Sequence, residues 1–200
     1  HYVNDPNDPT SIGANGVTSI KQAKDGKLWI GVFGGGINLF DPATNEFVRY
    51  THKPDDNQSI SGNRVLSVFE DSVGLLWLGT LGSGISIFDP TTTNSIRLMN
   101  EDNVFSSLGS NVILAIHEDS KKNIWVGTQG SGLNKLAAED RFSGNFNFER
   151  IVREEGLPSN AVYGIVEDSE GFLWISTNRG ITKYNPDTKQ LLNYDSSHGL

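Results

Sequence analysis

Cysteine is absent from the sequence, and methionine occurs once among 200 residues. Without thiols the chain can form neither disulfides nor thiolate metal sites. The cysteine content is therefore compatible with both the cytoplasm and a periplasm. Basic residues are few, because 16 lysines and arginines face 24 aspartates and glutamates for a formal net charge of -8. Phosphate backbones and anionic lipids attract the opposite charge, so we expect no nucleic-acid partner and no membrane contact by this segment.

Long apolar runs are also missing. The stretch from Val112 to Ile116 is typical, whereas a membrane span needs about 20 apolar residues and a signal peptide needs a basic flank before its apolar core. The sequence therefore predicts a soluble segment without a targeting signal. Glycine, in contrast, occurs 22 times and phenylalanine 10 times. This composition is typical of many short strands joined by tight turns and excludes a helical bundle.

An internal repeat dominates the sequence. Tryptophan occurs at positions 29, 77, 125 and 174, which are 48, 48 and 49 residues apart. Each tryptophan follows a segment of the form Asn-x-(Val/Ile)-x-x-(Ile/Val) and a turn, and it precedes a glycine-bearing turn and two further apolar segments. Four short strands in about 48 residues are typical of a propeller blade. The sequence therefore predicts an all-β propeller of four consecutive four-stranded blades.

An asparagine opens the first strand of each predicted blade. The expected boundaries are 1–14 for the tail of a preceding blade and its loop, 15–62 for blade 1, 63–110 for blade 2, 111–159 for blade 3, and 160–200 for blade 4 and the start of the next loop. Because both ends align with the inside of the repeat, we expect an arc of a larger propeller, with a closed four-bladed ring as the alternative. An open arc exposes apolar blade faces, which favours self-association.

Residues that recur in every unit are interpreted as structural. This group comprises Trp29, Trp77, Trp125 and Trp174, whose indoles can fill the wedge between adjacent blades. The turns Asp71–Gly74 and Asp168–Gly171 resemble Asx-type caps. Calcium is the alternative for their carboxylates, but Lys121, Lys122 and Asn123 occupy the matching turn of the third unit, which disfavours a cation. The glycines Gly34–Gly36 and Gly82–Gly84 are explained by strand reversal rather than by phosphate binding.

The repeat resembles the two-component regulator propeller family. The shared pattern is Asn-x-Val-x-x-Ile, then Glu-Asp-Ser-x-Gly-x-Leu-Trp-Ile-Gly-Thr, then Gly-Ile-x-x-Phe-Asp-Pro. The resemblance implies a ligand-sensing or signal-relaying segment of a bacterial transmembrane receptor, periplasmic or extracytoplasmic, within a propeller of about seven blades. The output would be a histidine kinase or a diguanylate cyclase elsewhere in the parent. Three sites depart from the pattern: Ala23 replaces the turn aspartate, Val32 a threonine, and Ala137-Ala138 the Asp-Pro pair.

Catalytic motifs are not found. The sequence has no nucleophile elbow, phosphate loop or zinc motif, and its four histidines are scattered. We therefore expect no catalytic residue, no metal and no cofactor in this segment. Two other functions stay open: a scaffold that binds a protein through acidic loops such as Asp55-Asp56 and Glu154-Glu155, and an enzyme similar to streptogramin lyases, whose propeller repeats carry related segments.

A small molecule or an oligosaccharide is the expected ligand. In a propeller, the loops from the second to the third strand and from the fourth strand to the next blade share the face at the channel mouth. Residues there that break the repeat are the candidates for specificity, and Arg64 and Arg179 could hold a carboxylate. The predicted binding set is Phe33, Arg64, Gln129 and Arg179, with Asn63, Asn111 and Asn160 at the strand entries. For the asparagines, local backbone bonding is the alternative.

Overall fold

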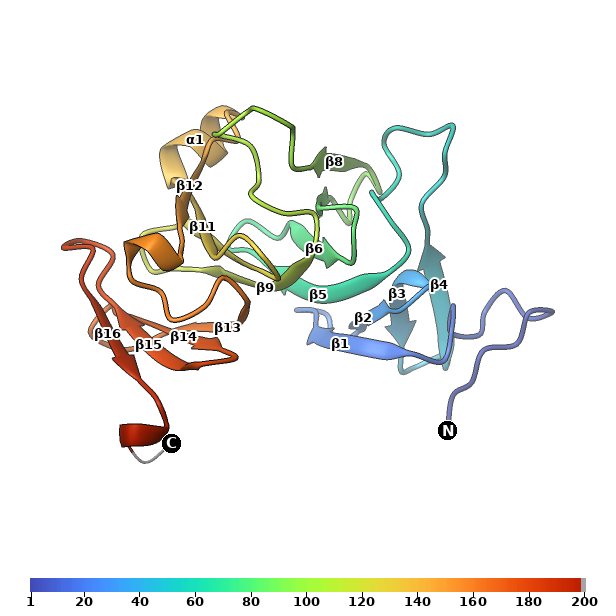
Figure 1. Ribbon diagram of the computed structural model, residues 1–200. Helices are drawn as coiled ribbons and strands as arrows, with labels where there is room; N and C mark the ends of the chain where they lie inside the picture. The colour runs from blue at the N-terminus through green and yellow to red at the C-terminus, as the bar shows by residue number, and fades with distance from the viewer. Residues whose placement is uncertain (199–200) are drawn as a thin grey trace. The chain divides into compact units, whose positions relative to one another are not determined.

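The computed structural model describes residues 1–198 (Figure 1), so residues 199–200, in the predicted loop after blade 4, lie outside the described residues. Its strands form four sheets, each an antiparallel meander of four consecutive strands, which we call blades 1 to 4. The prediction of an all-β chain with four four-stranded units is confirmed. The chain divides into two compact units, His1–Leu98 with blades 1 and 2, and Met99–Leu200 with blades 3 and 4.

The strands are short and evenly spaced. Blade 1 contains β1 (Val17–Gln22), β2 (Leu28–Val32), β3 (Gly36–Asp41) and β4 (Glu46–Tyr50); blade 2 contains β5 (Val65–Glu70), β6 (Leu76–Thr80), β7 (Ile85–Phe88) and β8 (Ser95–Leu98). Blade 3 contains β9 (Ile113–Glu118), β10 (Ile124–Thr128), β11 (Leu133–Leu136) and β12 (Phe148–Ile151); blade 4 contains β13 (Val162–Glu167), β14 (Leu173–Thr177), β15 (Gly180–Tyr184) and β16 (Leu191–Tyr194). Within residues 1–198 there are also three short helices: α1 (Ala138–Ser143), η1 (Arg153–Glu155) and η2 (Ser196–His198).

Burial follows strand position within a blade. The second strands β6 and β10 are buried along their whole length, and their sequences read as continuous apolar runs ending in Gly-Thr. The fourth strand β4 alternates instead, with Phe47 buried between exposed Glu46 and Val48. Inner strands contact neighbours on both faces, whereas outer strands keep one face in water, and the two hydropathy patterns reflect this difference.

Tryptophan joins consecutive blades within each unit. In the first unit, the ring centroid of Trp29 lies 5.8 Å from that of Phe88 in blade 2 and 5.9 Å from that of Tyr50. In the second unit, Trp125 lies 5.8 Å from Tyr184 in an edge contact and shares a buried cluster with residues of blade 4. The indole therefore packs into the next blade, where large apolar area is removed from water.

The four tryptophans differ in exposure. Trp29 is 5% exposed and Trp77 and Trp125 are 0% exposed, whereas Trp174 is partly exposed and stacks on Tyr194 at 5.8 Å. Trp174 and Tyr194 occupy in blade 4 the positions that Trp29 and Tyr50 occupy in blade 1. The Phe88 ring that completes the blade 1 cluster has no counterpart beside Trp174 within residues 1–198.

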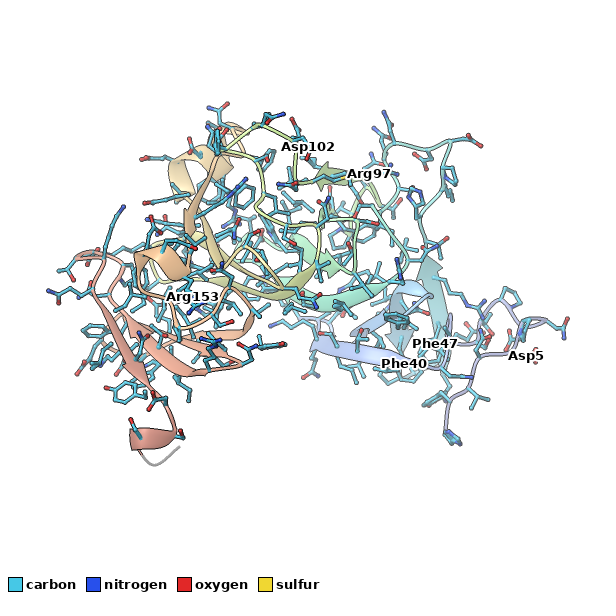
Figure 2. The ribbon with its side chains drawn as sticks, in the orientation of Figure 1. Asp5, Phe40, Phe47, Arg97, Asp102 and Arg153 are labelled. Carbon is cyan, nitrogen blue, oxygen red and sulfur yellow. The ribbon has the colours of Figure 1, made fainter. Side chains whose placement is uncertain are left out.

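The first residues cover the outer side of blade 1. The Tyr2 ring packs on Phe40 and Phe47 at centroid distances of 4.9 and 5.5 Å, and its hydroxyl donates to Asn45 at 2.6 Å. Figure 2 labels the two phenylalanines. The Phe47 amide donates to the Thr10 carbonyl at 2.8 Å. Residues 49–62 make equivalent contacts one repeat later, since Tyr50 packs on Phe88 at 5.0 Å. The opening segment thus packs like the link between two blades.

Blade 3 contains the one α-helix of the described chain. Where two repeats have Asp-Pro after the third strand, this repeat has Ala137-Ala138 and continues into α1. Arg141 in this helix is buried, and its guanidinium lies 3.3 Å from the Glu118 carboxylate. The sequence comparison marked the departure at Ala137-Ala138 but did not predict the helix, because six residues are too few for a periodic pattern.

Alkaline titration of Tyr184 is expected to report the junction of blades 3 and 4. Tyr184 is 2% exposed, and burial, together with the nearby Glu149 and Glu155 carboxylates, raises the pKa of its phenol to about 12. An unfolded tyrosine ionises near pH 10. Because the folded pKa is the higher one, the contribution to stability is complete below pH 10 and is lost between pH 10 and about 12. The ultraviolet absorbance of tyrosinate follows this ionisation. Tyr184→Phe should remove one of the tyrosines that ionise late in the titration. If the substitution instead removed a tyrosine that ionises near pH 10, the burial argument would be contradicted.

Candidate functional site

The predicted ligand residues of the first unit lie together. Phe33 and Arg64 form an isolated antiparallel bridge, so the loop between β2 and β3 runs beside the entry to β5. The Arg64 carbonyl accepts the Leu81 amide at 2.8 Å, which fixes its backbone. The Phe33 side chain is 44% exposed, and the Arg64 side chain is also exposed. Both side chains are therefore accessible to a ligand.

The predicted residues of the second unit are held by backbone contacts. The Gln129 amide donates to the Val112 carbonyl at 3.1 Å, and the Arg179 amide donates to the Thr177 hydroxyl at 3.1 Å. Both side chains are exposed. Gln129 and Arg179 belong to one unit and Phe33 and Arg64 to the other, so a single site containing all four stays a prediction.

The asparagines at the strand entries bracket loops. The side-chain oxygen of Asn63 accepts the His52 amide at 2.7 Å, that of Asn111 accepts the Asn100 amide at 2.7 Å, and that of Asn160 accepts the Arg153 amide at 2.7 Å. The same bond joins Asn15 and Asn4 at 2.7 Å. These amide oxygens hold the loops that lead into the blades. The bonds are those expected if the asparagines fix the local backbone rather than contact a ligand.

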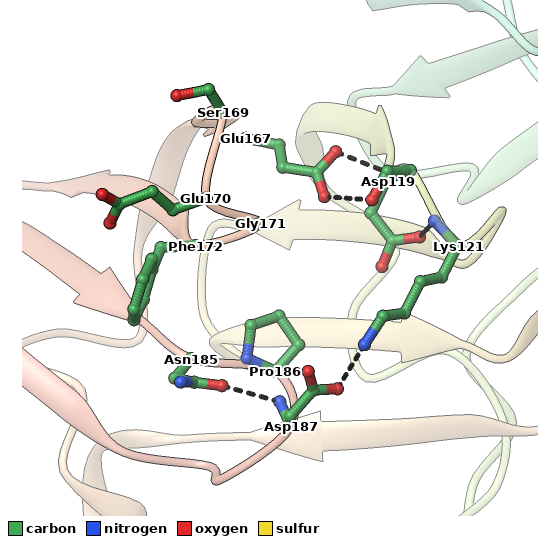
Figure 3. Close-up of a pocket in the computed structure, with 11 residues that line it drawn as sticks. Asp119, Lys121, Glu167, Ser169, Glu170, Gly171, Phe172, Asn185, Pro186 and Asp187 are labelled. Atoms are coloured by element: carbon green, nitrogen blue, oxygen red, sulfur yellow. Dashed lines mark hydrogen bonds and ion pairs between the residues drawn. The ribbon is translucent and has the colours of Figure 1, made fainter.

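A cavity opens at the other end of the second unit. It encloses about 280 Å³ between the β9–β10 turn of blade 3 and the β13–β14 and β15–β16 turns of blade 4. Figure 3 shows Phe172 and Glu170 on one side and Lys121 on the other, with Pro186 between them. This end carries none of the predicted ligand residues, because the turns that form it join the first strand to the second and the third to the fourth.

Polar groups of this cavity are engaged in pairs across the two blades. Glu167 accepts both the amide and the hydroxyl of Ser120, each at 2.7 Å. Lys121 pairs with Asp187, and this hydrogen bond raises the pKa of the Lys121 ammonium. The cavity can therefore hold a polar ligand beside Phe172, and it also fastens blade 3 to blade 4.

The turn carboxylates beside the cavity are structural. Asp168 accepts the Trp174 indole N–H at 2.8 Å and the amides of Glu170 and Phe172 at 3.0 Å each. The indole bond is the largest cause of the lowered pKa of Asp168, and Lys183 at 3.6 Å adds to it. Lys183 also lies 3.9 Å from the centroid of the Phe172 ring. Sequence reasoning missed this cavity; the available signal was Lys121, a cation where other repeats have a neutral or acidic residue.

Within residues 1–198, no three histidine or acidic side chains are grouped so that they could hold a metal ion. Among the same residues, no helix has the length and hydropathy that crossing a bilayer requires.

Comparison with known proteins identifies the repeat. The family model for the two component regulator propeller matches four segments, residues 11–34, 59–82, 107–130 and 156–179. A histidine kinase, P4 of Formosa agariphila, is 39% identical over 54 residues, which is 26% of this chain and 4% of that protein. These 54 residues correspond in length to about one blade with its connecting loop.

Solved structures share the fold over nearly the whole chain. The extracellular domain of BT4673 from B. thetaiotaomicron, named as a one component system, superimposes with a TM-score of 0.77 at 25% identity over 93% of this chain and 26% of its own. The extracellular domain of BT3049, named as a hybrid two component system of the same organism, superimposes with a TM-score of 0.63 at 26% identity. The match covers 95% of this chain and 30% of that domain. Virginiamycin B lyase from Staphylococcus aureus superimposes with a TM-score of 0.66 at 16% identity. The match covers 98% of this chain and 59% of the lyase, and it shows a likeness of fold alone. The chain spans about a quarter of the first of these structures.

Proposed function

Because this chain belongs to the two component regulator propeller family, of which it carries four repeats, we propose that it is a ligand-sensing or signal-relaying part of a bacterial transmembrane receptor. The observation that carries the proposal is the combination of those repeats with the 25–26% identical extracellular domains of signalling systems. On this proposal the segment lies outside the cytoplasm, and the enzymatic output, a histidine kinase or a diguanylate cyclase, belongs to the rest of the parent.

The proposed segment binds and does not catalyse. Phe33 and Arg64, whose backbones form a bridge, supply an exposed ring and an exposed guanidinium, a pair that suits a small molecule or oligosaccharide with an anionic group. An enzyme is the alternative function, because a lyase shares the fold.

Further blades of the parent are the proposed partners of blade 4. In the first unit, Trp29 and Tyr50 enclose Phe88 of the following blade. Trp174 and Tyr194 present the same pair of rings, and Leu192 nearby in β16 is 56% exposed. A following blade with an aromatic residue at the end of its third strand fits this face. Self-association is the second way to cover it.

Loss of Arg64 or Arg179 is expected to weaken ligand binding. A guanidinium on a ligand carboxylate contributes on the order of 1.5–3 kcal/mol, so Arg64→Ala and Arg179→Ala should each raise the Kd by about tenfold or more. Calorimetric titration of the whole propeller region with neutral and acidic oligosaccharides and small metabolites measures it, with Lys53→Ala as the control for charge. Unchanged affinity in both arginine variants removes these residues from the site, and turnover of any compound favours the lyase-like alternative.

A further inference from the structure

Three of the four blades bind a carboxylate of their own at the turn between the first and second strands. Asp71 is the example in blade 2: one oxygen accepts the Trp77 indole N–H at 2.7 Å, and the other accepts the amides of Val73 and Leu75 at 3.0 and 2.9 Å. Asp119 and Asp168 make the same three bonds in blades 3 and 4. The turn thus forms a receptor for a carboxylate, made of one indole and two amide donors.

Blade 1 retains the turn and the tryptophan but lacks the carboxylate. Ala23 stands at the aspartate position, and it packs against the buried cluster that contains Trp29. Trp29 pairs across β1 and β2 with Lys21, two residues before Ala23, as Trp77 pairs with Phe69, two residues before Asp71. The backbone of blade 1 therefore holds the indole in the register in which the other blades bind their aspartate.

Two of the three donors have no acceptor in this blade. The Trp29 side chain is 5% exposed, and its indole N–H has no hydrogen-bond acceptor within residues 1–198; the same is true of the Asp25 amide. The Lys27 amide is the third donor and is satisfied by the Asp25 carboxylate at 3.1 Å. The indole nitrogen itself reaches solvent, so it is able to donate to an oxygen placed over Ala23.

A groove gives access to this position. It encloses about 510 Å³ in the first unit and is lined by the β1–β2 turn, Ala23 included, and by Glu70, Asp71 and Ser72 of blade 2. Lys21 and Lys24 supply positive charge, and the opposing anions are Glu70 and the Asp25 carboxylate, which caps the Lys27 amide in the same turn. Asp71 also carries a negative charge, but its carboxylate is bound by three N–H donors. The two lysines thus offset part of the negative charge of these carboxylates.

We propose that the groove over Ala23 is a binding site for a small carboxylate that takes the place of the missing aspartate. One carboxylate oxygen accepts the Trp29 indole N–H and the other accepts the Asp25 amide, in the arrangement that Asp71 adopts one blade later. Lys21 and Lys24 stabilise the charge at the rim. The site lies at the opposite end of the blade from Phe33, and the inference does not depend on the proposed signalling role.

Acetate is the probe for this site, because its methyl group and carboxylate correspond to the Cβ and carboxylate of an aspartate side chain. In ¹H–¹⁵N spectra of the propeller region, the Trp29 indole resonance is the one that Trp29→Phe removes. Titration with acetate should move it downfield, as expected for a new charge-assisted hydrogen bond. Acetamide, which has the same shape without the charge, should bind about tenfold or more weakly.

Ala23→Asp restores the internal carboxylate and should occupy the site permanently. We expect the Trp29 resonance of this variant to lie downfield without acetate and to stop responding to it, whereas Ala43→Asp, which adds the same charge at an exposed turn of the first unit, should respond like the unmodified chain. Three outcomes would overturn the proposal: no response to acetate at 100-fold molar excess or more, equal responses to acetate and acetamide, or an undiminished response in Ala23→Asp. The first outcome would indicate that water alone satisfies the indole.

Discussion

Trp125→Ala is expected to lower the free energy of unfolding by about 3–5 kcal/mol, the range for truncating a large buried aromatic side chain. The indole is 0% exposed and packs between blades 3 and 4 against Leu133, Leu173 and Tyr184. Its N–H also satisfies the Asp119 carboxylate at 2.7 Å. The substitution thus opens a cavity at a blade junction and removes one partner of a buried hydrogen bond, so both effects act in the same direction.

Chemical denaturation followed by circular dichroism measures this loss. Phe105→Ala is the matched control, because Phe105 is an aromatic residue of the same unit that is 86% exposed, and its truncation should change stability by no more than about 0.5 kcal/mol. A loss below about 1 kcal/mol for Trp125→Ala would mean that the indole is not part of the core. Equal losses for the two variants would mean that burial does not determine the result.

The repeat explains why the strands could be predicted from the sequence. Each tryptophan stands in an apolar second strand, and each glycine turn after it begins a third strand, so one pattern read four times located all the sheets. Contacts with the next blade could not be predicted in the same way. Trp125 and Trp174 occupy equivalent positions, yet the first is fully buried and the second is partly exposed. Burial depends on a neighbouring sheet, which the residues around an indole do not specify.

The candidate sites show the same limit. Phe33 and Arg64 were chosen because they break the repeat on one face, and the backbone bridge between them agrees with that placement. The cavity beside Phe172 depends instead on Lys121 and Asp187, which are 66 residues apart and come together only through the packing of blade 3 on blade 4. The sequence shows that Ala23 replaces the aspartate of the repeat. The consequence, a missing carboxylate beside the Trp29 indole, follows only from the hydrogen bonds that Asp71 makes in the next blade.

Gly132→Ala is expected to lower the free energy of unfolding by roughly 2–4 kcal/mol, because it combines backbone strain with a steric clash. Gly132 has φ +66°, and a Cβ there would lie 2.2 Å from the Ile151 carbonyl oxygen, a backbone atom that cannot rotate away. Gly36 in blade 1 has the same conflict, with φ +71° and 2.3 Å to the Tyr50 oxygen. The chain thus needs glycine where the third strand begins beside the end of the fourth, and this crowding explains the recurring glycines without a phosphate ligand.

Gly130→Ala is the control within the same turn. A Cβ at Gly130 meets nothing within 4 Å, and its φ is not positive, so this substitution should change stability by no more than about 0.5 kcal/mol. The two variants add the same methyl group two residues apart, and urea denaturation compares them directly. If Gly132→Ala were as stable as Gly130→Ala, the close approach to the Ile151 carbonyl would not be a requirement of the fold. The glycine pattern would then need an explanation outside strand geometry, and a ligand at the glycine turn would become the leading one.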